Sequence, residues 1–206
     1  ADMSERMLRE VFLPPFIKAI SAGCTTLMPS HNDLNGIPCH GNKWLLNDLL
    51  RKEMGFNGVI VSDWLDVERI HSYHKLVPTK DEAYLMGFQA GIDVHMHGPG
   101  FAESVLKALQ EGKVDIKTVD ERVAKILELK FQLGLFERPF VDLKAIPKKV
   151  FTAEHKQTAL DMARRSIVLL KNENNMLPLQ KGRYKKIFVT GHNADNQSTL
   201  GDWSFE

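Results

Sequence analysis

Hydrophobic residues recur at the period of an α-helix in several segments of the chain. From Ser4 to Ala22, apolar positions return every three or four residues, which predicts a helix that ends at Gly23. The Pro14-Pro15 pair inside this segment should kink the helix or split it in two. The same pattern predicts further helices over residues 43–54, 81–90, 101–110, 116–133 and 152–170.

Some details of these helices follow from single residues. The helix over 116–133 should be capped at its start by Thr118 or Asp120, and the helix over 152–170 by Thr152. In the helix over 43–54, we expect the inward-facing residues to be Trp44, Leu45, Leu49 and Leu50.

Short apolar runs of strand length lie between the helices, at residues 25–28, 58–62 and 92–96. Strands that alternate with helices imply a parallel sheet with right-handed crossovers, and the pattern fits an open doubly wound sheet as well as a barrel. A complete (β/α)₈ barrel takes about 250 residues. Only these three strands precede Leu135, so a barrel would be present here only as its second half.

The chain changes character after residue 136. A stretch with Pro139 and Pro147 predicts a linker, and a new strand is expected at residues 186–190. We therefore predict one α/β unit over 1–136, a linker and connecting helix over 137–170, and the beginning of a second α/β domain over 171–206.

The composition fits a globular protein, with 43% hydrophobic and 26% charged residues. The net charge is +1 and no basic stripe is interleaved with aromatics, so nucleic acid is not an expected partner. No apolar run approaches the ~20 residues that span a bilayer. The chain starts at Ala1 without an initiator Met, so the lack of a visible signal peptide says little about compartment. Cys24 and Cys39 have no zinc-type spacing, and we expect buried or partly buried thiols.

The strongest candidate for chemistry is Asp63, which follows the β-branched run Val59–Val61. A carboxylate there lies at the C-terminal face of a parallel sheet, where barrels and doubly wound folds place their sites. Trp64 beside it offers a flat apolar face for a sugar ring. An Asp that merely caps the next helix is the simpler alternative.

The neighbouring strand ends also carry polar groups. His31, Asn32 and Asp33 follow the preceding strand, although Asp33 and Asn35 could simply form a turn. His95 and His97 follow the next strand and could bind a metal, but no third ligand is close in sequence. Three further residues could line the pocket rim or be solvated, namely Arg69, His71 and His74.

Five blocks of this sequence resemble the β-glucosidases of glycoside hydrolase family 3, in the family's order from about Glu10 to Trp203. The blocks are MPSHNDLNGIPCHGNKWLLNDLLRKEMGFNGVIVSDW, FQAGIDVHM, KFQLGLFERPF, ARRSIVLLKNENNMLPL and KKIFVTGHNADN. The resemblance implies an α/β fold, namely the C-terminal half of a (β/α)₈ TIM-like barrel followed by the start of an α/β sandwich. It also implies that the chain is an internal piece of a longer enzyme.

The resemblance further implies a retaining β-glucosidase with Asp63 as nucleophile, Trp64 as sugar platform and His31 as a substrate-binding residue. His31 departs from the aromatic or small residue that many members have there. The family's other sugar-binding residues lie upstream of this chain and its acid/base downstream, so neither Glu173 nor Glu206 is assigned that role. No cofactor or metal is implied, and the 206-residue chain alone is expected to be inactive.

The implied substrate is an oligosaccharide or β-glucoside with a terminal, non-reducing β-D-glucosyl residue. A β-xylosidase or arabinosidase of the same family stays open, as do a non-catalytic structural piece and an unrelated barrel enzyme such as an aldolase or metal hydrolase. The expected partners are the remainder of the parent enzyme and, as an option, a second copy in a homodimer. The family suggests a periplasmic or secreted location.

Overall fold

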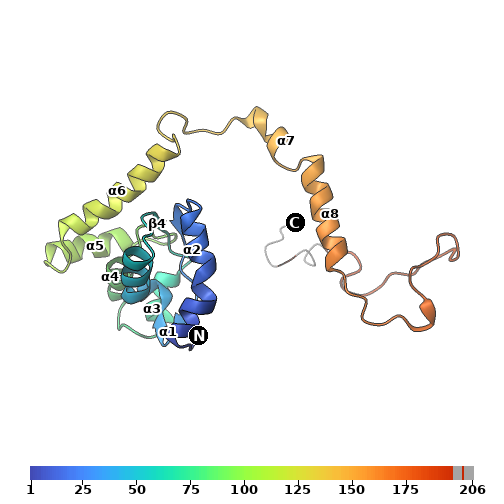
Figure 1. Ribbon diagram of the computed structural model, residues 1–206, viewed down its shortest axis with the longest axis horizontal. Coiled ribbons are helices and arrows are strands. Elements are labelled where there is room, and N and C mark those ends of the chain that lie inside the picture. Colours follow the sequence, from blue (N-terminus) through green and yellow to red (C-terminus); the bar gives the residue numbers. More distant parts are fainter. Residues whose placement is uncertain (197–200, 202–206) are drawn as a thin grey trace. The chain divides into compact units, whose positions relative to one another are not determined.

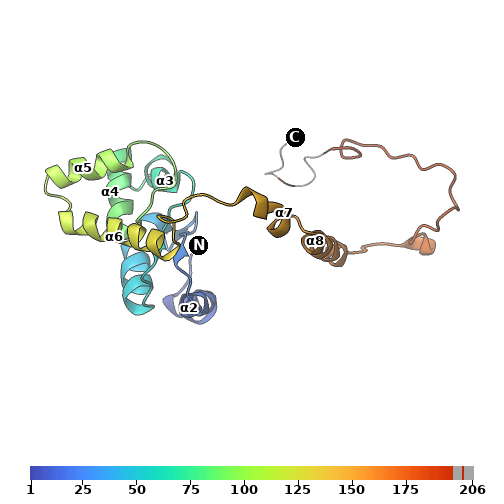
Figure 2. The same cartoon turned by 90° about the horizontal axis from the view of Figure 1, so that it is seen from above.

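The computed structural model describes residues 1–196 and 201, and the chain divides into two compact units, Ala1–Val141 and Asp142–Glu206 (Figures 1 and 2). All the described strands belong to the first unit. Its elements are, in chain order, α1 Glu5–Met7, η1 Leu8–Phe12, α2 Leu13–Ser21, β1 Thr26–Leu27, β2 Asp33–Leu34, β3 Ile37–Pro38, η2 Cys39–Gly41, η3 Trp44–Glu53, β4 Val59–Ile60, α3 Asp66–Ser72, α4 Lys80–Ala90, α5 Phe101–Gln110 and α6 Ile116–Gln132.

The parallel strands of the first unit follow one another in chain order. β1 pairs with β4 in the register Thr26 to Val59 and Leu27 to Ile60, and Val61 forms a parallel bridge with Val94. The three apolar runs therefore lie side by side as predicted, but each is shorter, and residues 92–96 contribute only the single bridge. Parallel strands separated by helices confirm the predicted α/β class.

The core of the first unit forms where helices cover these strands. Ile60 and Ile92 are fully buried against Leu46, Leu50 and Phe56. Helix α4 packs against α3 and α5, which lie beside it in Figures 1 and 2. Continuous β-branched strands are typical of sheets covered on their faces by helices. This packing fixes the strand ends from which the candidate site is built.

The N-terminal helix is not split at the two prolines, because it runs without a break from Glu5 to Ser21 and changes only its winding. The π-helix η1 ends at Phe12, and α2 begins at Leu13 with Pro14 and Pro15 in its first turn. Proline is tolerated in a first turn because its missing N–H would have no intrahelical acceptor there.

The predicted inward face of the helix over 43–54 was partly wrong. The segment η3 is a π-helix, with i→i+5 winding, and it buries Leu46, Leu49 and Leu50. Trp44 lies on the exposed side instead. The wider winding changes which residues share a face, so the 3.6-residue period assigned the wrong first residue.

Two further predictions need correction. Asp115, not Thr118 or Asp120, caps α6, because its side chain accepts a hydrogen bond from the backbone N–H of Lys117. The helices predicted from the sequence also omit residues 66–72, which form α3 and bury Val67 and Ile70 against α4.

Helix α4 starts with a complete capping box. The hydroxyl of Thr79 accepts the backbone N–H of Glu82, and the Glu82 carboxylate accepts the backbone N–H of Thr79.

We predict that Thr79→Ala lowers the free energy of unfolding by about 1 kcal/mol. Urea unfolding of wild-type and variant chains measures this. Thr118→Ala, inside α6, is the control and should not destabilise, because alanine is the better helix former. Equal midpoints for Thr79→Ala and wild type would contradict the prediction.

The second unit contains η4 Leu143–Ala145, α7 Ile146–Lys149, α8 Ala153–Ser166 and η5 Glu173–Asn175. Thr152 caps α8 as predicted, accepting the N–H of His155, but the helix ends at Ser166 rather than near residue 170. The strand predicted at 186–190 does not form, because a strand needs a hydrogen-bonded neighbour and the described residues supply none.

Within residues 1–196 and 201, no helix is long and apolar enough to cross a membrane.

Candidate active site

Asp63 lies just past the C-terminal end of β4, where the backbone is held on both sides. Ser62 before it is fully buried, and its backbone N–H donates to the carbonyl of Val94. The Ser62 hydroxyl accepts the N–H of Met96 at 2.9 Å. The carboxylate of Asp63 therefore projects from a fixed strand end, with about a quarter of the side chain exposed to solvent (26%).

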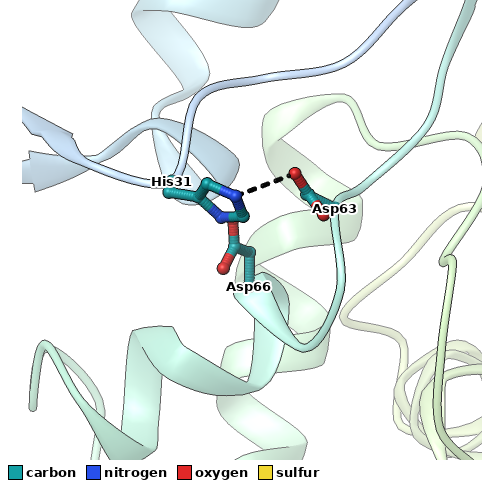
Figure 3. A group of neighbouring side chains, drawn as sticks. All are labelled: His31, Asp63 and Asp66. Atoms are coloured by element: carbon teal, nitrogen blue, oxygen red, sulfur yellow. Dashed lines mark hydrogen bonds and ion pairs between the residues drawn. The ribbon is translucent and has the colours of Figure 1, made fainter. Parts of the chain in front are cut away.

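Both oxygens of the Asp63 carboxylate have a close polar contact. Oδ1 accepts the backbone N–H of Trp64 at 2.5 Å, and Oδ2 lies 3.0 Å from Nε2 of His31. Asp63 does not cap α3, whose first residue is Asp66 and whose N-cap residue is Leu65. The helix-cap alternative is therefore wrong, and the carboxylate faces the loop that carries His31 (Figure 3).

His31 connects Asp63 to a second carboxylate. Its Nδ1 lies 2.6 Å from Oδ2 of Asp66, at the start of α3. The Asp66 side chain is almost completely buried (2% exposed), and its Oδ1 accepts a hydrogen bond from Arg69 at 2.8 Å. Figure 3 shows the imidazole of His31 between the two carboxylates. The site thus contains Asp66 and Arg69 in addition to the predicted residues.

His40 holds the backbone of Asp63 and was not anticipated from the sequence. It is buried, and its Nε2 accepts the backbone N–H of Asp63 at 3.0 Å. Accepting that bond requires an unprotonated Nε2, hence a neutral ring. Burial lowers the pKa of His40, which favours this neutral form. No periodic signal marks a single buried histidine in a short 3₁₀ turn, so sequence patterns could not have identified it.

Trp64 presents an exposed ring beside Asp63. About half of its surface is accessible (52%), and the ring centroid lies 3.6 Å from that of His97 at an angle of 35°. Nδ1 of His97 is buried without a hydrogen-bond partner within the described part of the chain. Trp64 and His97 together form an aromatic wall beside the strand end that carries Asp63.

His95 points away from this wall. Its Nε2 lies 3.1 Å from the buried Glu68, and its ring stacks on Phe101 at 4.9 Å. The hydroxyl of Tyr84 contacts the same carboxylate at 3.1 Å. His95 and His97 therefore face different surroundings, and the described residues place no third metal ligand with this pair.

Across the described residues, the one group of His, Cys, Asp and Glu side chains close enough to share a cation is His31, Asp63 and Asp66, with atoms within 4.8 Å. The two carboxylates, however, lie against different nitrogens of one imidazole ring. The imidazole of His31 lies between the two carboxylates, with Nδ1 hydrogen-bonded to Asp66 and Nε2 at 3.0 Å from Asp63.

The remaining candidates have structural contacts. Asp33 and Asn35 form the turn between β2 and β3, where the Asp33 carboxylate accepts the N–H of Gly36 and this bond lowers the pKa of Asp33. His71 contacts the carbonyl of Val77 at 3.0 Å, and His74 packs edge-on against Tyr73. The turn interpretation is therefore confirmed, and His71 and His74 have no contact with Asp63.

The two cysteines differ from each other. Cys24 is exposed, contrary to the expectation of a buried or partly buried thiol, because it lies in the loop between α2 and β1. Cys39 is buried as expected, and burial raises the pKa of its thiol to about 11. Its burial and raised pKa make the Cys39 thiol a poor nucleophile.

Comparison with known proteins identifies the family. Residues 1–129 match the sequence model of the glycosyl hydrolase family 3 N terminal domain. The chain belongs to glycosyl hydrolase family 3. Residues 167–206 also match the model of the family 3 C-terminal domain, so both domain types of the family are represented.

Individual family 3 relatives cover nearly the whole chain. A β-xylosidase of Formosa agariphila is 40% identical over 96% of this chain, which corresponds to 28% of the relative. A periplasmic β-glucosidase of Salmonella typhimurium is 32% identical over 98%, or 27% of the relative. The solved structure of a β-glucosidase from intestinal bacteria, described as involved in saponin metabolism, superposes with a TM-score of 0.85 at 39% identity over 99% of this chain and 27% of its own. The chain thus spans about a quarter of the length of these family 3 proteins.

Proposed function

We propose that the chain is the nucleophile-bearing part of a retaining β-glucosidase, with Asp63 as the nucleophile. The supporting observation is a partly exposed carboxylate at the end of a buried strand, with one oxygen hydrogen-bonded to the backbone N–H of Trp64, the other 3.0 Å from His31, and the ring of Trp64 beside it. These contacts hold the carboxylate in one orientation, and the tryptophan offers a face for the sugar's C–H surface.

In the proposed reaction, an Asp63 oxygen forms a bond to the anomeric carbon while the bond from that carbon to the leaving oxygen breaks. A general acid gives its proton to the leaving oxygen. Water then attacks the glycosyl-enzyme and passes its proton to the same group, which regenerates the Asp63 carboxylate.

The acid/base is expected in a part of the enzyme outside this chain, with its carboxyl about 5–5.5 Å from that of Asp63 in the retaining geometry. Glu173 is exposed and pairs with Lys171, so nothing supports it in this role. Glu206 and Trp203 lie outside the described residues.

The parallel order β1, β4 and Val94 supports the proposal of the second half of a (β/α)₈ barrel. Residues 1–136 would form this half, residues 137–170 the linker and connecting helix, and residues 171–206 the start of an α/β sandwich. The remainder of the parent enzyme would complete both domains, and this chain alone would then be inactive. A homodimer and a periplasmic or secreted location remain part of the proposal, the latter supported by the name of the Salmonella relative.

The proposed substrate is an oligosaccharide or β-glucoside with terminal β-D-glucose. The Formosa relative is named a β-xylosidase, which favours xylose as the second candidate. Comparing kcat/KM for 4-nitrophenyl β-D-glucoside, β-D-xyloside and α-L-arabinofuranoside with the complete enzyme decides between them. Turnover of none of these by a folded enzyme would favour the non-catalytic alternative.

The mechanism is tested by incubating the complete enzyme with 2-deoxy-2-fluoro-β-glucosyl fluoride, followed by digestion and mass spectrometry. The fluorine slows the second step, so the glycosyl-enzyme accumulates. We expect the label on the peptide that contains Asp63. Label on another peptide would overturn the assignment of Asp63 while keeping a retaining mechanism.

Trp64→Ala should raise KM for 4-nitrophenyl β-glucoside by about tenfold, the effect of losing about 1.4 kcal/mol of contact with the sugar face. Steady-state kinetics of the complete enzyme measures this. The matched control is Trp44→Ala, which removes a similarly exposed indole from η3 and should leave KM unchanged. An unchanged KM in Trp64→Ala would exclude the ring from substrate binding.

A further inference from the structure

Each ring nitrogen of His31 faces a different carboxylate. Nδ1 lies 2.6 Å from Oδ2 of Asp66, and Nε2 lies 3.0 Å from Oδ2 of Asp63. The Nδ1 contact is a hydrogen bond, and the Nε2 contact is a close polar contact with the carboxylate of Asp63. Figure 3 shows the imidazole between the two carboxylates.

The two ends of this link differ in how firmly they are held. The Asp66 side chain is buried, and its second oxygen accepts from Arg69 at 2.8 Å. The His31 side chain is mostly exposed (61%), in the loop after β1. An exposed imidazole has many orientations unless a bond selects one, and here the short contact with Asp66 selects it.

The nucleophile candidate depends on this selected orientation. Oδ1 of Asp63 is fixed by the backbone N–H of Trp64, which comes from the same short segment. The described polar contact of Oδ2 is with Nε2 of His31, at 3.0 Å. Without the imidazole, the carboxylate would keep one bond and could rotate about its Cβ–Cγ axis.

We propose that Asp66 and His31 are positioning residues: Asp66 fixes the imidazole of His31, and the imidazole fixes Oδ2 of Asp63 in the orientation for attack. This inference rests on the proposed role of Asp63 as nucleophile. Holding the attacking group in its reactive orientation lowers the barrier of the chemical step rather than strengthening substrate binding. The effect should therefore appear in kcat and not in KM.

The test is a double-mutant cycle in the complete enzyme with His31→Ala, Asp66→Asn and the double variant, assayed on 4-nitrophenyl β-glucoside. We expect each single variant to lower kcat by about 10- to 100-fold, the factor that one charge-assisted hydrogen bond represents, with KM little changed. The kcat of the double variant should be no lower than that of the more impaired single variant, because both changes break the same chain of contacts.

Asp48→Asn is the matched control, since this aspartate is exposed on η3, pairs with Lys52 and should keep wild-type kcat. Losses that multiply in the double variant, or a His31→Ala enzyme with wild-type kcat, would overturn the inference. If Asp66→Asn does not fold, the exposed His31 variant decides alone.

Fluorosugar labelling separates the two proposals. Label on Asp63 with unchanged kcat in the variants would refute only this inference, whereas the absence of label on Asp63 would refute its role as nucleophile.

Discussion

Replacing Asp63 with asparagine in the complete enzyme should lower kcat/KM for a β-glucoside by about four orders of magnitude, the scale on which the loss of a nucleophile acts. An amide cannot form the glycosyl ester, so the covalent route is closed. The backbone N–H of Trp64 can still donate to the amide oxygen, so the fold should be retained. Steady-state kinetics and a thermal melt of the same preparation measure both effects.

The matched control for this variant is Asp33→Asn. Asp33 is the first residue of β2, its carboxylate accepts the N–H of Gly36 within a turn, and asparagine can make the same bond. Its kcat/KM should equal that of the wild type. A second variant, Asp63→Ala, leaves room for azide, which would then attack in place of the carboxylate and give the α-glycosyl azide. Retained activity in Asp63→Asn, or a β-azide product, would refute the role of Asp63.

The position of the candidate nucleophile was predictable from local sequence. The β-branched run Val59–Val61 indicated a buried strand, and the residue at the end of such a strand lies at the face where α/β folds place their sites. The structure confirms the strand and brings His31, Asp63 and Trp64 together. Their roles in catalysis stay predictions until the variants are measured.

The supporting polar residues were not predictable. Asp66 and His40 act on residues 35 and 23 positions away in the chain, and such single long-range contacts leave no periodic trace. Asp66 is the first residue of α3, a helix that was not predicted, although Val67 and Ile70 are spaced as one face of a helix. Burial of a polar residue is determined by its partners, which a pattern of apolar positions does not contain.

Local winding and missing neighbours explain the other differences. A period of 3.6 residues cannot anticipate the π-winding of η3, which turned Trp44 outward. The apolar run Ile187–Val189 has strand character, yet its side chains are exposed because no described segment pairs with it. Strand formation depends on a partner, so composition alone was insufficient there.

The largest stability effect is expected at Asp93, whose side chain is completely buried (0% exposed) between two arginines. Oδ2 accepts from Arg51 at 2.6 Å and from the backbone N–H of Ile60 at 2.7 Å, while Oδ1 accepts from Arg122 at 3.1 Å. Burial lowers the pKa of Arg51, which records the cost of keeping a guanidinium out of water. This one carboxylate joins η3, β4 and α6.

Asp93→Ala should lower the free energy of unfolding by about 3–5 kcal/mol, because it leaves two buried guanidinium groups without their counter-charge. Urea unfolding measures the loss, with Asp48→Ala as the control, since that exposed i,i+4 pair with Lys52 contributes only about 0.5 kcal/mol. Replacing all three charges together, in Asp93→Leu with Arg51→Met and Arg122→Met, should recover much of the stability because no unpaired charge then remains. A loss in Asp93→Ala no larger than in the control would mean that the arginines find other partners, and that the carboxylate is not what holds these elements together.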